Sequence, residues 1–245
     1  GNERAKKPAL RIAGDLLEAS SNQERARLLV ATGFLAVGTK NLSEQNDKQF
    51  RADIIDEQID SLSRSILASS IACARCHDHK FDAFAMQDYY ALAGIFASTK
   101  TYFGTYVSPA SQQGGELLQL PRHEQDVALH KSVPAKRLQQ MKEQLAELKA
   151  ERAEMDAALA ALFAGKKPKK TFTLTQALGN IWRTGPIVGT LQIVDETGQA
   201  VPVAMGVLDS EQIADAPLLT RGEVNRPGET VPRAFPRAIS VADTP

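Results

Sequence analysis

Apolar residues recur with a helical period through the first hundred residues of the chain. One stripe predicts an amphipathic helix that continues for two further turns to Cys73. Its members are Ile55, Ile59, Leu62 and Ile66. The segment 20–38 predicts an earlier helix, with Ser20 or Ser21 as its N-cap and Gly38 as its stop. The segment 86–96, "MQDYYALAGIF", predicts a further helix.

A heptad pattern marks the segment 134–165. Apolar residues there alternate spacings of three and four, and only Arg152 interrupts the seam. The seam consists of Leu138, Met141, Leu145, Leu148, Arg152, Met155, Leu159 and Leu162. Because the heptads number fewer than four, the pattern favours an antiparallel helical hairpin within one molecule, or self-association through 138–162. The lysines of 166–170 follow the helix end, where positive charge complements the helix dipole; a polyanion site is the alternative.

From about Thr171 the pattern changes to that of strands and loops. The segment 189–208, "GTLQIVDETGQAVPVAMGVL", predicts two strands around an Asp-Glu-Thr-Gly turn. The segment 221–238, "RGEVNRPGETVPRAFPRA", predicts an ordered loop rather than a strand, because it is dense in glycine, proline and arginine. The fold class we predict is therefore mostly α with a C-terminal β-containing part (α+β).

Three regions follow from these patterns. We expect a helical domain with the cysteines over 1–110 and a helical hairpin or coiled-coil insertion over 111–170. A β-containing segment over 171–245 would begin a second domain. The first residues lack a signal-peptide pattern, which by itself decides little. The last residues lack a closing helix or strand pattern, so we expect a part of a longer chain.

Charge and hydropathy exclude two classes of partner. Lys and Arg together number 29, as do Asp and Glu, so no net charge of the whole chain favours nucleic acid or an acidic membrane. No apolar run approaches the roughly 18 residues that span a bilayer, so we predict no membrane span.

The sharpest chemical signal is "CARCH", residues 73–77, which holds both cysteines of the chain. It has the C-x-x-C-H pattern of covalent c-type haem attachment. Two thiols three residues apart on a helical turn can reach the two vinyl groups of a porphyrin, and the adjacent histidine can bind the iron. We therefore predict that Cys73 and Cys76 hold haem c and that His77 ligates its iron.

Eight of the fourteen aromatic residues lie close to this motif in sequence. They are Phe81, Phe84, Tyr89, Tyr90, Phe96, Tyr102, Phe103 and Tyr106. They would either wall a haem from water or form the core of a small domain. A second axial ligand is open among Met86, Met141, Met155, Met205, His123 and His130, and five-coordinate iron is allowed.

Three other interpretations of the motif stay open. The first is a site for zinc or another divalent metal, with the ligands Cys73, Cys76, His79 and Asp82. The second is a disulfide between the two cysteines, and the third is a pair of idle thiols.

Several segments resemble, in order, those of the Planctomycete-specific cytochrome c-like family. They are "IAGDLL", "ATGFLAVG", "DEQID", "CARCHDHKFD", "DYYALAGIF" and "RGEVNRPGETVPRAFPR". The resemblance is weakest over 134–165. It implies a secreted or envelope-associated protein whose relatives accompany polysaccharide-degrading enzymes. It also draws attention to residues beyond a bare haem motif. His79 or Asp82 would bind another ion or position a substrate, and Asp78 would orient an imidazole. The alternative is that Asp78 caps a helix and Lys80 pairs with an acid.

The function we expect is electron transfer by a haem protein of the periplasm or extracellular space. Its partners would be a redox protein and, in a role linked to polysaccharide breakdown, a polysaccharide. The alternative is a metal- or disulfide-stabilised scaffold or binding module without haem, and the sequence leaves open whether the protein is an enzyme.

Overall fold

The computed structural model describes residues 3–105, 113–123 and 131–240. Helices predominate, and three small antiparallel two-stranded sheets accompany them, so the fold is mixed α+β as predicted. The α-helices are α1 (Glu3–Ala13), α2 (Asn22–Ala31), α3 (Asp47–Leu62), α4 (Met86–Ala97), α5 (Ala135–Phe163) and α6 (Leu174–Gln192). The strands are β1 (Thr99–Tyr102), β2 (Leu118–Gln119), β3 (Val203–Ala204), β4 (Gly206–Asp209), β5 (Ala216–Leu219) and β6 (Pro227–Val231). Short helical turns are η1 (Thr32–Leu35), η2 (Ser63–Leu67), η3 (Ile71–Arg75), η4 (Thr220–Gly222) and η5 (Arg237–Ile239).

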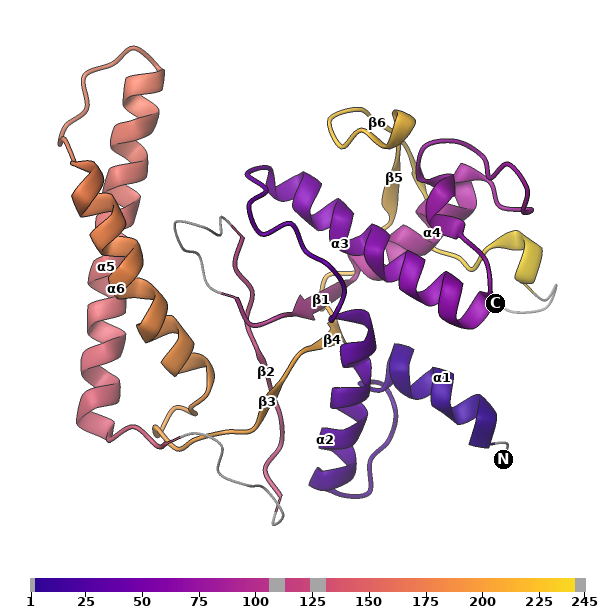
Figure 1. Ribbon diagram of the computed structural model, residues 1–245, viewed down its shortest axis with the longest axis horizontal. Helices are drawn as coiled ribbons and strands as arrows, with labels where there is room; N and C mark the ends of the chain where they lie inside the picture. The colour runs from indigo at the N-terminus through magenta and orange to yellow at the C-terminus, as the bar shows by residue number, and fades with distance from the viewer. Residues whose placement is uncertain (1–2, 106–112, 124–130, 241–245) are drawn as a thin grey trace.

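The molecule consists of a helical body and a projecting arm (Figure 1). The body contains α1 to α4 and the strand pairs β1–β4 and β5–β6. Its core is centred on α3 and α4, where Ile59 and Leu92 are almost fully buried. One sheet of the body joins strands that are far apart in the sequence, because β1 pairs with β4 from Thr99↔Asp209 to Tyr102↔Gly206. The other sheet joins consecutive strands, β5 and β6.

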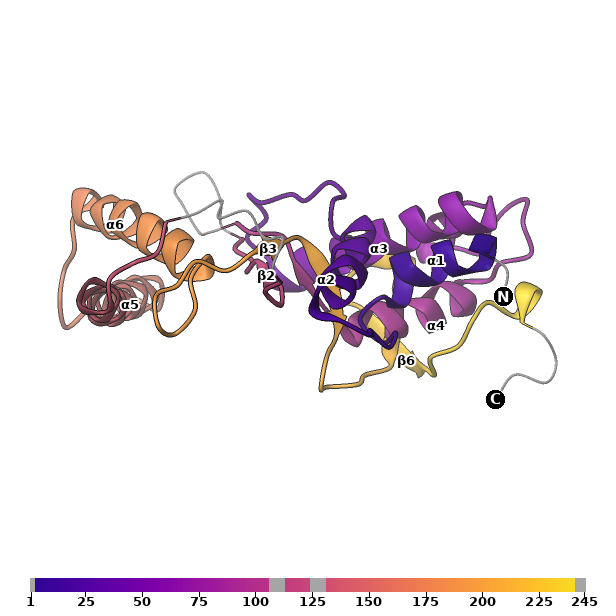
Figure 2. The same ribbon diagram turned by 90° about the horizontal axis from the view of Figure 1, so that it is seen from below.

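Helix α5 and helix α6 form the arm, which the extended strands β2 and β3 join to the body (Figures 1 and 2). The seam residues Met141 and Leu148 pack against Ile187 of α6. Asn180 of α6 donates to the Leu148 carbonyl at 2.9 Å. Helices α5 and α6 thus form an antiparallel hairpin within one molecule, one of the two arrangements that the seam favoured, and α6 covers the seam around Met141 and Leu148. The second helix of this hairpin lies beyond residue 170, where strands and loops were predicted.

The N-cap predicted from the sequence explains where α2 begins, although this helix ends at Ala31 and not at the predicted stop Gly38. Ser21, rather than Ser20, is the N-cap of α2, because its hydroxyl accepts from the Glu24 N–H at 3.1 Å. Helix α5 begins directly after Pro134 and ends before Gly165, whose φ of 68° suits glycine. The helix predicted over 86–96 is α4.

The strand prediction for 189–208 was wrong in its first part. Residues 189–192 end α6, and only the Val194↔Ala200 bridge closes the predicted turn. The later strands β3 and β4 pair with β2 and β1. A capping box between Thr173 and Gln176 starts α6, and packing on α5 overrides the strand propensity of its C-terminal half.

The loop prediction for 221–238 was also wrong in part, because Pro227–Val231 forms β6. Proline is tolerated as the first residue of a strand at a sheet edge, where no N–H is required. The division of the chain at 110 and 170 stays a prediction. No described helix is long and apolar enough to cross a bilayer.

Candidate functional site

The two cysteines do not continue α3, contrary to the prediction of one helix as far as Cys73. Helix α3 ends at Leu62 and is followed by the π-helical turn η2, and Ala68 then has a left-handed φ of 52°. The hydroxyl of Ser63 donates to the Asp60 carbonyl at 3.3 Å, and Ser65 donates to the Ser61 carbonyl. Serine side chains that bond to helix carbonyls in this way favour bending and termination of a helix.

Cys73 lies in the 3-10 helix η3 and Cys76 caps its end. Because a 3-10 helix has three residues per turn, residues three apart share one face. Ile71 and Ala74 occupy the inner face and have no exposed surface. Cys73 and Cys76 share another face, and both are exposed, free thiols. The fold therefore presents the two sulfur atoms outward together.

The ring of His77 is exposed and oriented by its own loop. Its Nδ1 lies 2.8 Å from the Asp78 carbonyl oxygen. Since a carbonyl oxygen can only accept, Nδ1 carries the proton and donates. The lone pair of the other ring nitrogen, Nε2, is consequently available to a metal ion.

His79, two residues away, is held in the opposite tautomer, with its proton on Nε2. Its side chain is only 7 % exposed, and its Nδ1 accepts from the N–H groups of Phe81 (3.2 Å) and Asp82 (2.8 Å). The ring proton is therefore on Nε2, which lies 3.1 Å from the Ser70 hydroxyl. Neither nitrogen of His79 has a free lone pair.

This arrangement bears on the alternative zinc set, which requires His79 as a ligand. In the part of the chain that the structure describes, no three His, Cys, Asp or Glu side chains are grouped so that they could hold a metal ion. A zinc site at Cys73, Cys76, His79 and Asp82 stays a prediction that needs the loop 77–85 to rearrange.

The remaining residues of "HDHKFD" have structural contacts. Asp78 accepts from the Met86 N–H at 2.8 Å and so caps the first turn of α4, as one alternative predicted. Lys80 lies over the Phe81 ring, 5.2 Å from its centroid, instead of pairing with an acid. The N–H of His79 donates to the Phe84 carbonyl at 2.8 Å and closes the loop.

A network of ion pairs and hydrogen bonds anchors η3 to α3 and α4, and the sequence analysis did not predict it. The Arg75 side chain, 15 % exposed, pairs with Asp53 at 3.0 Å and Asp56 at 3.5 Å. Tyr89 donates to Asp56 at 2.7 Å, and Tyr90 donates to the Arg75 carbonyl at 2.9 Å. Arg75 is one of the two variable positions of the C-x-x-C-H pattern, so the motif alone carried no signal for it.

Burial sets the protonation of this network. It raises the pKa of the Asp56 carboxyl, although hydrogen bonds from Tyr89 and Arg75 oppose the rise. Burial also raises the pKa of Tyr90 to about 12. Both phenols therefore stay protonated near neutral pH and donate their hydrogen bonds.

The aromatic residues near the motif serve mainly as core. Phe84, Tyr89, Tyr90 and Phe96 belong to the buried cluster of the body. Phe103 packs edge-on against Phe50, with ring centroids 6.0 Å apart, whereas Phe81 is exposed. Tyr106 lies outside the described residues.

The candidates for a second axial ligand are spread over the molecule. Met141 and Met155 are buried in α5, in the arm (Figure 1). Met86 and Met205 pack against the core of the body. His123 lies just after β2, and His130 lies outside the described residues.

A segment far along the chain, the turn η4, packs against Cys76. This turn lies so close to Cys76 that a Cβ on Gly222 would be 2.8 Å from the Cys76 sulfur. Tyr90 also donates to the Leu219 carbonyl, at 3.3 Å. The segment "RGEVNRPGETVPRAFPR" therefore begins directly against the cysteine motif.

Comparison with known proteins adds one relationship. Residues 9–101 are similar to PSCyt2, a protein family of unknown function (DUF1549). The matched region includes both cysteines, the Arg75 network and α4, but it covers less than half of the chain. No curated protein and no solved structure matches the chain. The resemblance predicted from the motifs is thus confirmed at the level of a family of unknown function, whose description assigns no cofactor.

The contact between η4 and the PSCyt2-like region gives a testable prediction. Gly222 and Gly165 have similar left-handed φ values, 73° and 68°, but a Cβ on Gly165 would meet nothing within 4 Å. We expect Gly222→Ala and Gly165→Ala each to cost about 1 kcal/mol, because alanine is strained in this conformation. Only Gly222→Ala should displace the Cys76 sulfur.

The measurement is the rate at which Cys76 reacts with iodoacetamide in a Cys73→Ala background. Gly222→Ala should change this rate at least severalfold, and Gly165→Ala should leave it unchanged. Equal rates in the two variants would contradict the packing of η4 on Cys76.

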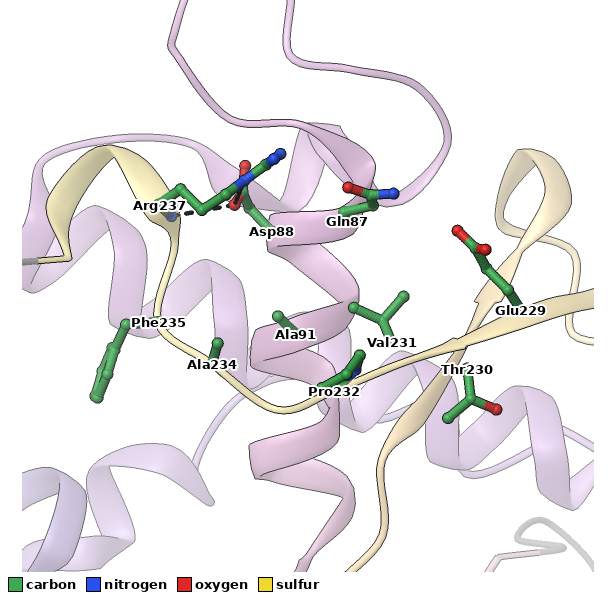
Figure 3. Close-up of a pocket in the computed structure, with 10 residues that line it drawn as sticks. All are labelled: Gln87, Asp88, Ala91, Glu229, Thr230, Val231, Pro232, Ala234, Phe235 and Arg237. Carbon is green, nitrogen blue, oxygen red and sulfur yellow. Dashed lines mark hydrogen bonds and ion pairs between the residues drawn. The ribbon is translucent and has the colours of Figure 1, made fainter. Parts of the chain in front are cut away.

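A cavity of about 330 Å³ lies elsewhere on the body, between α4 and β6 with the segment that follows β6 (Figure 3). Asp88 and Arg237 form an ion pair at one end of it, and neither cysteine lines it. The Asp88 carboxylate already accepts from the Ala85 N–H, the Arg237 N–H and the Arg237 guanidinium. It is therefore occupied as a structural acceptor and is not available as a general base.

Proposed function

We propose that the protein attaches one c-type haem through Cys73 and Cys76, with His77 as an axial ligand. The observation that carries the proposal is the state of His77: its Nδ1 donates to the Asp78 carbonyl, which leaves Nε2 free to bind iron. The outward position of both thiols on one face of η3 is its second support.

The residues present fit this group. Each thiol would add across one vinyl group, so that a sulfur–carbon bond forms and the thiol proton passes to the other vinyl carbon. The addition balances without an oxidant, and the product weighs as much as the protein plus one haem. When bound, the haem would supply a reversible one-electron carrier.

The surrounding residues would hold the site in shape. The Asp78 carbonyl fixes the His77 ring, and the Arg75 network with Tyr90 holds the backbone between the two cysteines. A carrier of this kind passes electrons to a redox partner protein. We also propose that it acts outside the cytoplasm, in the periplasm or extracellular space, in a role linked to polysaccharide breakdown.

The test is denaturing mass spectrometry of protein produced with c-type haem maturation machinery. We expect the wild type to gain one haem, roughly 616 Da, and to show a Soret band. Cys73→Ala/Cys76→Ala should gain no mass. His77→Ala should keep the mass but change the absorbance spectrum, because it retains both thioethers and loses the axial ligand.

Two outcomes would contradict the proposal. An unmodified mass would leave a bare metal or idle thiols, and a mass lower by about two hydrogens would indicate a Cys73–Cys76 disulfide. Either outcome would favour the scaffold or binding module without haem.

A further inference from the structure

The charge of the chain is unevenly distributed although its total is zero. No Asp or Glu occurs from Ala157 to Val194, and this segment carries five cations. They are Lys166, Lys167, Lys169, Lys170 and Arg183. The segment forms the end of α5, the loop that follows and α6, so the positive charge is concentrated at the distal end of the arm (Figure 1).

Exposed apolar side chains also occur in the arm, and four of them lie at its distal end. Among the described residues, five large ones in the arm are more than half exposed. They are Leu159 (53 %), Leu162 (59 %), Phe163 (85 %), Leu174 (75 %) and Trp182 (70 %). Packing of α5 on α6 uses the seam residues nearer the body, so none of the elements that the structure describes covers these side chains. Trp182 lies farther along α6, where its neighbours Asn180 and Arg183 contact Leu148 and Glu151 in the middle of α5. We call the other four residues and the lysines of 166–170 the arm tip.

Three of the four lysines are available to a ligand. Lys170 pairs with Glu154 at 2.8 Å and stacks on Phe172. Lys166, Lys167 and Lys169 are exposed and form no ion pair with any described residue. All four lysines line a cavity of about 660 Å³ against the alanines of the last turns of α5.

We propose that the arm tip docks on the surface of an anionic lipid bilayer. Lysines attract the phosphates of anionic headgroups, while leucine and phenylalanine side chains enter the boundary between headgroups and acyl chains. The arm projects from the body in both views, so the tip can reach a flat surface without obstruction (Figures 1 and 2). This proposal is independent of the haem.

Other occupants fit less well. A second copy of the chain would bring the same lysines together, and like charges oppose such a contact. A soluble polyanion would neutralise the lysines but leave Leu162, Phe163 and Leu174 in water. A bilayer satisfies both kinds of side chain at once.

The experiment is flotation of the purified full chain with vesicles. One set contains phosphatidylcholine alone, and the other contains phosphatidylcholine with a minor fraction of phosphatidylserine. We expect binding to the anionic vesicles only. Lys166→Gln/Lys167→Gln/Lys169→Gln should weaken binding roughly 100-fold, since each lysine near an anionic surface contributes about fivefold.

Two further variants separate the alternatives. Lys136→Gln/Lys142→Gln/Lys149→Gln removes three exposed lysines of α5 that lie nearer the body than the arm tip. This variant should bind almost as the wild type does. Phe163→Ser/Leu174→Ser should weaken vesicle binding roughly tenfold or more, because less apolar surface enters the membrane. Circular dichroism would check that each variant keeps its helices.

Four results would overturn the proposal. The first is no binding to anionic vesicles, and the second is equal loss in the two lysine variants. The third is full binding by Phe163→Ser/Leu174→Ser together with tight binding of dextran sulfate, which would identify a polyanion site. A concentration-dependent dimer that only the tip variants abolish would identify a second copy as the occupant.

Discussion

Asp88→Asn is expected to destabilise the protein by about 3 kcal/mol. The Asp88 side chain is 5 % exposed, and its two oxygens accept from the Ala85 N–H at 2.8 Å and from Arg237 at 3.1 Å. An asparagine side chain has one acceptor oxygen, and its amide hydrogens would face one of these donors. A buried N–H would then lose its partner. Chemical denaturation of wild type and variant measures the difference.

Arg237→Gln is the matched control for this substitution. The Arg237 side chain is 69 % exposed, so loss of its ion pair should lower the free energy of unfolding by at most about 1 kcal/mol. The backbone N–H of residue 237 remains to bond with Asp88. Equal losses in the two variants would contradict the view that the buried carboxylate matters chiefly as an acceptor of backbone hydrogen bonds.

The effect of Asp88 should depend on pH. Burial by itself would raise the pKa of Asp88, but the N–H of Ala85 and both donors of Arg237 outweigh it, so the pKa lies below its ordinary value. A carboxyl whose pKa is lower in the folded state stabilises the fold above the unfolded pKa of about 4. That stability is lost as the pH falls through the folded pKa. The difference between wild type and Asp88→Asn should therefore be constant above about pH 5 and shrink below about pH 4.

His79→Gln is expected to cost about 2 kcal/mol, whereas His79→Asn should cost about 1 kcal/mol or less. The buried Nδ1 of His79 accepts from the N–H groups of Phe81 and Asp82. The side-chain oxygen of asparagine can take the position of Nδ1, but that of glutamine reaches farther along the side chain. The better-tolerated variant thus identifies which ring nitrogen matters.

The same pair of variants tests whether His79 has a role in metal binding. If His79 served as a ligand through Nε2, glutamine would be the better mimic and asparagine the worse one. Chemical denaturation ranks the variants in the metal-free protein, and titration with zinc measures affinity. A higher stability of His79→Gln than of His79→Asn would contradict the hydrogen bonds described for the loop 77–85.

Local patterns were sufficient for the helices that have strong periodicity and clear end signals. The apolar period of α3 predicted that helix, although not its end at Leu62. This period, the seam of α5 with Gly165 beyond it, and the serine cap of α2 are all properties of neighbouring residues. Each is set by contacts three or four residues apart along one helix. The short seam also predicted that α5 needs a partner, but it left open whether that partner is a helix of the same molecule or a second copy.

Local patterns failed where a distant contact decided the structure. The segment that ends α6 has strand-like residues, yet packing of Ile187 on the α5 seam makes it helical. Residues 227–231 are rich in proline and glycine, yet pairing with β5 makes them a strand. In both cases the free energy of burying or pairing a segment exceeded its weak intrinsic preference.

The candidate site divides in the same way. The sequence by itself determined that two thiols and an adjacent histidine lie together, because five consecutive residues of one covalent chain cannot lie far apart. Only the tertiary structure decided that His77 has a free nitrogen while His79 has none, and that Arg75 is held by Asp53 and Asp56. The physical reason is that a hydrogen bond depends on where the donors and acceptors of a folded loop come to lie, and spacing along the chain does not specify those positions.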